Sequence, residues 1–68
     1  MADRDPALQK AIDEAGGVGK LAEALGVTGP AVSQWQRVPV ERVLDIERHT
    51  GVSRHDLRPD IYPRDAAA

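Results

Sequence analysis

The chain has 68 residues, a net charge of −2 and no cysteine. A chain of this length forms one small domain that buries about 60% of its unfolded surface, which excludes a roomy active-site cleft. The lack of cysteine excludes disulfides, and no apolar run approaches the ~18 residues of a membrane span, so we expect a soluble cytoplasmic protein. Because the domain has no room for an active-site cleft, we also expect that it is not an enzyme.

The first predicted helix begins at Asp5-Pro6. An aspartate side chain caps free N–H groups, and a proline costs nothing in a first turn. Apolar residues then recur with the i, i+3, i+4, i+7 spacing of one helix face: Leu8, Ala11, Ile12 and Ala15. The pair Gly16-Gly17 ends this helix, because glycine accepts the left-handed conformation of a helix C-terminus.

Two further helices follow. The second has the same spacing at Val18, Leu21, Ala22 and Leu25, and Gly26 closes it. The third begins near Thr28, whose hydroxyl is a suitable cap, and runs to about Arg37 with Pro30 in its first turn. Its inner face is expected to carry Val32 and Trp35.

A fourth helix is predicted from Pro39 to about Thr50. Its apolar arc comprises Val40, Val43, Leu44 and Ile46. Gly51 stops it, and a short turn of helix follows Ser53. The sequence thus predicts an all-α domain over residues 6–62 with four helices and a short fifth, flanked by flexible ends at 1–5 and 63–68.

Residues 18–37 have the pattern of two helices joined by a tight turn. Ala22 is small enough to let the two helices approach, and Gly26 supplies the backbone freedom of the turn. Apolar or small residues occupy the positions that hold both helices to a common core: Leu21, Ala22, Leu25, Gly26, Val27, Val32 and Trp35.

The segment LAEALGVTGPAVSQWQR resembles the helix-turn-helix of the Cro and YdaS-like repressor family of phages, prophages and toxin–antitoxin loci. The run VERVLDIERHTGVSRHDLRPDIYP is similar to that family's downstream helix and tail, so the resemblance covers residues 16–63. It implies a lambda-repressor-like helix-turn-helix fold and a sequence-specific regulator of transcription, a repressor, that binds double-stranded operator DNA.

The resemblance implies that the helix over residues 28–37 reads the major groove, where each base pair shows a distinct pattern of donors and acceptors. The amide of Gln34 can pair with adenine, Ser33 can reach a base or a phosphate, and Arg37 can meet guanine or the backbone. The candidate DNA-binding residues are Lys20, Thr28, Gly29, Pro30, Ser33, Gln34 and Arg37.

Two of these candidates open a helix and are expected to meet phosphates. Thr28 lies at the start of the reading helix. The family often has a glutamine for a phosphate contact near the start of the preceding helix, but this chain has Val18-Gly19-Lys20 there, and we expect Lys20 to supply the contact instead. Gly29 and Pro30 would let the backbone approach DNA closely. Because one small module contacts few base pairs, we expect a homodimer on two half-sites, with Ile61 and Tyr62 or the fourth helix in the self-contact.

Two alternatives stay open. An antitoxin that represses its own operon would use the same surface and also bind a toxin. A helix-turn-helix-shaped interaction module without DNA binding is favoured by the acidic composition. Against that module, the motif itself carries two cations and one anion: Lys20, Arg37 and Glu23.

The remaining polar residues predict no cofactor or metal site. His49 and His55 have neither a cysteine nor a second histidine at helical spacing beside them. Glu47 falls within the apolar arc of the fourth helix, where a carboxylate needs a partner. We expect Arg58 to form a salt bridge with Glu47 and so to hold the C-terminal segment on the domain.

Overall fold

Five α-helices and one 3₁₀ turn occur in residues 4–63, the part of the chain that the computed structural model describes. The elements are α1 (Pro6–Ala15), α2 (Val18–Leu25), α3 (Gly29–Gln34), η1 (Val40–Arg42), α4 (Val43–Thr50) and α5 (Arg54–Leu57). No strand occurs among these residues, and the predicted all-α, lambda-repressor-like helix-turn-helix class is confirmed. None of these helices is long and apolar enough to cross a membrane.

The ends of α1 and α2 follow from local sequence. The carboxylate of Asp5 accepts a hydrogen bond from the Ala7 N–H at 3.0 Å, which caps α1 as predicted. Gly16 ends α1 with a φ of 100°, and Gly26 ends α2 with a φ of 73°. A side chain at either φ would strain the backbone, so glycine permits both turns.

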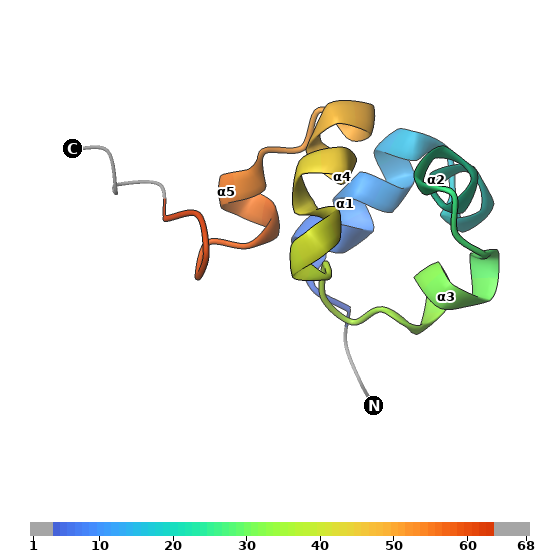
Figure 1. The fold of residues 1–68 in the computed structure, drawn as a ribbon, viewed down its shortest axis with the longest axis horizontal. Coiled ribbons are helices and arrows are strands. Elements are labelled where there is room, and N and C mark those ends of the chain that lie inside the picture. The colour runs from blue at the N-terminus through green and yellow to red at the C-terminus, as the bar shows by residue number, and fades with distance from the viewer. Residues whose placement is uncertain (1–3, 64–68) are drawn as a thin grey trace.

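The hydrophobic core lies around α1, which contacts both α2 and α4. Figure 1 shows α2 and α3 at one end of the longest dimension and α5 toward the other. Every helix contributes to one continuous set of buried side chains: Leu8, Ala11, Ile12, Leu21, Ala22, Val32, Val38, Val43, Ile46, Val52 and Leu57. The helix-turn-helix is therefore held against the same core as the C-terminal helices.

The fourth helix is shorter than predicted, and two of its expected core residues are exposed. The chain forms the 3₁₀ turn η1 before α4 begins at Val43. A 3₁₀ turn has three residues per turn instead of 3.6, which rotates the face that points inward. Val40 in this turn is 51% exposed. Leu44 is 46% exposed because it lies about 100° from Val43 and about 160° from Ile46 around α4, and both of those residues are fully buried.

The third helix also ends earlier than predicted. α3 stops at Gln34, since Trp35 has extended backbone angles and the following chain leads to the fully buried Val38.

Asp5 donates its N–H to the Gln36 carbonyl at 2.8 Å, so part of the expected flexible N-terminus pairs with the domain. Residues 1–3 and 64–68 of the two predicted ends lie outside the described residues.

We expect Leu21→Ala to lower the free energy of unfolding by about 2–5 kcal/mol, because it leaves a cavity beneath α2. Leu44→Ala is the matched control and should change it by under about 0.5 kcal/mol, since Leu44 is largely in solvent. Urea denaturation followed by circular dichroism measures both. Equal losses for the two variants would contradict the observed helix phase.

Candidate nucleic-acid interface

The helix-turn-helix consists of α2, the turn at residues 26–28, and α3. Thr28 is extended and its hydroxyl oxygen accepts a hydrogen bond from the Ala31 N–H at 3.2 Å, as expected for a cap. Pro30 lies in the first turn of α3, where its missing N–H leaves no bond unmade. Both features fix the residue at which α3 begins.

One face of the motif packs inward. Leu21, Ala22 and Val32 are buried, and Val32 is wholly inaccessible. The other apolar residues expected in the motif core are half-buried and pack against its edge: Leu25, Val27 and Trp35. Trp35 makes this contact from the extended segment after α3 and not from the helix itself.

The opposite face of the motif presents most of the predicted DNA-binding residues. Six of the seven are exposed: Lys20, Thr28, Pro30, Ser33, Gln34 and Arg37. Gly29 is half-buried. The structure places Thr28 through Gln34 together on or beside α3, whereas Arg37 lies three residues beyond its end. Arg37 was therefore wrongly predicted to be part of the helix.

The N-terminus of α2 carries positive potential. Gly17 precedes the helix and offers no side chain to cap it, so N–H groups of the first turn remain without a side-chain partner. Lys20 is exposed in the same turn. Oriented N–H groups and an ammonium group together attract an anion such as a phosphate.

Arg4 contacts α3, although its position in the sequence predicts only a flexible end. Its guanidinium donates to the Ser33 carbonyl at 3.0 Å and to the Gln9 side chain at 3.1 Å. The last carbonyls of a helix have no partner within it, so this bond caps the C-terminus of α3. No helical periodicity points to such a contact from 29 residues away.

A second arginine acts in the same way on α2. Arg42 of η1 directs its guanidinium at the Leu25 carbonyl, at 3.5 Å. A cation at this end of a helix interacts favourably with the helix dipole. Arg4 and Arg42 thus each contact the C-terminal end of one motif helix, and helical periodicity predicts neither contact.

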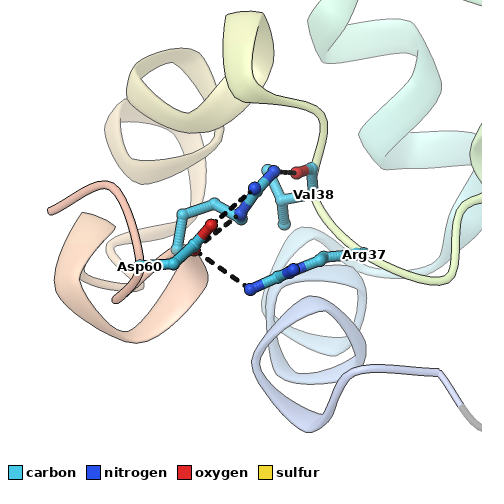
Figure 2. A network of polar contacts seen from close by, with 4 residues as sticks. Arg37, Val38 and Asp60 are labelled. Carbon is cyan, nitrogen blue, oxygen red and sulfur yellow. Dashed lines mark hydrogen bonds and ion pairs between the residues drawn. The ribbon is translucent and has the colours of Figure 1, made fainter.

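Arg37 takes part in a polar network with the C-terminal segment (Figure 2). Arg58 donates to both carboxylate oxygens of Asp60, at 3.0 and 2.8 Å, and to the Val38 carbonyl at 2.7 Å. Arg37 reaches the same carboxylate from the other side, at 3.0 Å. This network ties the segment after α3 to the segment after α5.

The predicted salt bridge between Glu47 and Arg58 is wrong. Glu47 pairs with Arg54 at 3.1 Å and also accepts the Arg54 backbone N–H at 3.0 Å, so its carboxylate caps α5. Arg58 follows α5 and points toward Val38 instead. Arg58 thus contacts Asp60 and Val38, and it holds the C-terminal segment on the domain through these residues and not through Glu47.

Tyr62 holds the same segment at a second place. Its carbonyl accepts a hydrogen bond from His55 Nδ1 at 2.8 Å, and its ring lies 5.8 Å from the Arg54 guanidinium carbon. The ring is half-buried against the core. Among residues 4–63, no group of three or more acidic, histidine or cysteine side chains is placed to hold a metal.

A family model described as bacterial toxin YdaS matches residues 8–66. The chain belongs to the YdaS family. The match extends from α1 across the helix-turn-helix to the polar network around Asp60.

The YdaS-family chain is also similar to a solved structure. The relative is the Cro protein from the putative prophage element Xfaso 1 in Xylella fastidiosa strain Ann-1, with 47% sequence identity and a TM-score of 0.76. The similarity covers 81% of this chain and 92% of the Cro chain. The search of curated proteins gives no match.

The hydrogen bond from Arg58 is the main reason that the pKa of Asp60 falls from 3.8 to about 2 in this YdaS-family domain. The positive charge of Arg37 acts in the same direction. A lowered carboxyl pKa means that the ionised form stabilises the fold above the unfolded pKa. This stability is lost as the pH falls through the folded value.

We therefore expect the melting temperature of the wild type to exceed that of Asp60→Asn by a constant amount above about pH 4. The difference should shrink between about pH 4 and pH 2, where the wild-type carboxyl becomes protonated. Thermal unfolding followed by circular dichroism across this pH range measures it. A difference that is the same at pH 2 and pH 5 would show that ionised Asp60 does not stabilise the fold.

Proposed function

We propose that the protein is a sequence-specific regulator of transcription, a repressor, that binds double-stranded operator DNA with α3 in the major groove. The observation that carries this proposal is the division of α3 into two faces. Val32 is wholly buried on one face, while Ser33 and Gln34 are exposed on the other. The Cro relative at 47% identity supports the same function.

The exposed side chains of α3 suit the reading of base edges. The amide of Gln34 has a donor and an acceptor, so it can pair bidentately with adenine. The hydroxyl of Ser33 can reach a base or a phosphate. Pro30 and Gly29 present little side-chain volume at the start of α3, which allows the backbone to come close to DNA.

Contacts to phosphates would come from the edges of the motif. Lys20 and the free N–H groups of α2 offer one site. The Thr28 hydroxyl uses its oxygen to cap α3 and keeps its proton to donate to a phosphate. Arg37 follows the C-terminal end of α3 by three residues, whereas Lys20 and Thr28 precede the helix in the chain.

Useful affinity is proposed to require two copies of the domain. A helix-turn-helix dimer binds half-sites about 34–36 Å apart, one turn of DNA. The longest dimension of one copy is 38 Å, so adjacent copies with that dimension along the duplex would come into contact range. Large apolar side chains remain exposed for a self-contact: Val40, Leu44 and Ile61.

An interaction module without DNA binding is a second candidate, favoured by the net charge of −2. The two functions differ in their dependence on salt. Phosphate contacts release counterions, so affinity falls by roughly 0.9 log units per log unit of salt for each phosphate neutralised. Interaction with a protein partner carries no such requirement.

The proposal predicts that Gln34→Ala weakens binding to the preferred duplex by about 1–3 kcal/mol, because one base pair loses its reader. The preferred duplex is first selected with wild-type protein from a random DNA pool, and affinities are then measured by fluorescence anisotropy. Ser33→Ala should reduce the preference at a neighbouring position.

His49→Ala is the matched control, since His49 is an exposed polar residue on α4 and outside the motif. It should bind as the wild type does. The proposal fails if the wild type binds no duplex at low salt. It also fails if Gln34→Ala and Ser33→Ala leave the sequence preference unchanged.

A further inference from the structure

The carboxylate of Asp60 has one firm partner. Arg58 engages both of its oxygens at 3.0 and 2.8 Å, and a third nitrogen-to-oxygen contact joins Arg58 to the Val38 carbonyl at 2.7 Å. The Arg58 side chain is only 13% exposed. Arginine and a carboxylate in such a two-pronged arrangement form a strong, directional pair. Asp60 is therefore fixed in place and neutralised without help from Arg37.

Arg37 is held much more weakly by the same carboxylate. One nitrogen, Nη2, approaches Asp60 Oδ1 at 3.0 Å, and the Arg37 side chain is 52% exposed. An exposed ion pair of this kind contributes little to stability. If Arg37 left, Asp60 would still have both of its bonds to Arg58. The transfer of Arg37 to another anion therefore leaves no carboxylate unpaired.

Arg37 is also close to the proposed reading helix. It lies three residues after Gln34, and three residues span at most about 11 Å. The major groove is about 12 Å wide between its phosphate walls. With α3 in the groove, the Arg37 backbone would lie within about 11 Å of Gln34, close enough for its side chain to extend to a phosphate of the wall.

We propose that Asp60 competes with a DNA phosphate for Arg37, so that the C-terminal segment lowers the affinity of the domain for DNA. This inference rests on the proposed function. In the free protein the guanidinium of Arg37 bonds to the Asp60 carboxylate. On DNA it exchanges that carboxylate for a phosphate oxygen, while Asp60 remains with Arg58. The exchange replaces one ion pair by another, and its cost reduces the net gain from the phosphate contact.

Asp60→Asn tests this competition, because asparagine keeps the size of the side chain and removes its charge. Binding is measured by fluorescence anisotropy with a short labelled duplex of random sequence over a series of salt concentrations. We expect Asp60→Asn to bind about two- to fivefold more tightly at low salt. Its salt dependence should equal that of the wild type, because Arg37 neutralises the same phosphate in both complexes.

The same substitution in an Arg37→Gln background separates competition from a general effect of charge. There, Asp60→Asn should give no gain beyond that of Glu14→Gln in the same background. Glu14→Gln makes the same change in net charge at an exposed position in the last turn of α1. Circular dichroism at the temperature of the titration verifies that each variant is folded.

Two results would overturn the proposed competition, and a third would overturn the proposed function. Unchanged or weaker binding by folded Asp60→Asn overturns the competition, while the proposed function stands. An equal gain with and without Arg37 does the same, because Asp60 would then act only as a repelling charge. Failure of the wild type to bind any duplex at low salt overturns the proposed function itself.

Discussion

The burial of Val32 is the constraint on which the exposed face of α3 depends. α3 has only six residues, and isolated helices of that length are unstable in water. Its geometry must therefore come from packing. Val32 supplies this from the middle of α3, while Thr28 caps one end and Arg4 the other. The exposed Ser33 and Gln34 have a defined orientation because their neighbour is fixed in the core.

Elements set by neighbouring residues could be predicted from the sequence. The caps at Asp5 and Thr28 and the glycine at the end of α2 each act within a few positions, so the pattern of residue types was sufficient. The length of α3 was not predictable in this way. Helical spacing continues to Trp35, but the chain leaves the helix to bury Val38 and to pair Gln36 with Asp5. Those contacts join residues distant in sequence.

In the candidate site, too, features set by local spacing were predictable, and contacts between distant residues were not. Exposure of Ser33 and Gln34 followed from the helical phase of α2 and α3, which the apolar spacing revealed. The partners of the charged residues did not follow, because several arginines lie within reach of any one acid. Glu47 was assigned to Arg58, yet the start of α5 brings Arg54 to it, with both side chain and backbone N–H. Only the path of the chain after Leu57 decides which arginine faces Val38.

The distribution of these partners leaves positive charge beside the motif of a domain whose net charge is negative. Arg4 and Arg42 contact carbonyl oxygens, which are neutral, so their positive charges are not cancelled by an acid in those contacts. Arg58 and Asp60 cancel each other and leave the positive charge of Arg37 in excess. The polar network around Asp60 therefore carries a net positive charge beside the motif, although the whole chain carries a net negative charge. Local charge, and not the total, governs attraction to a phosphate within a Debye length.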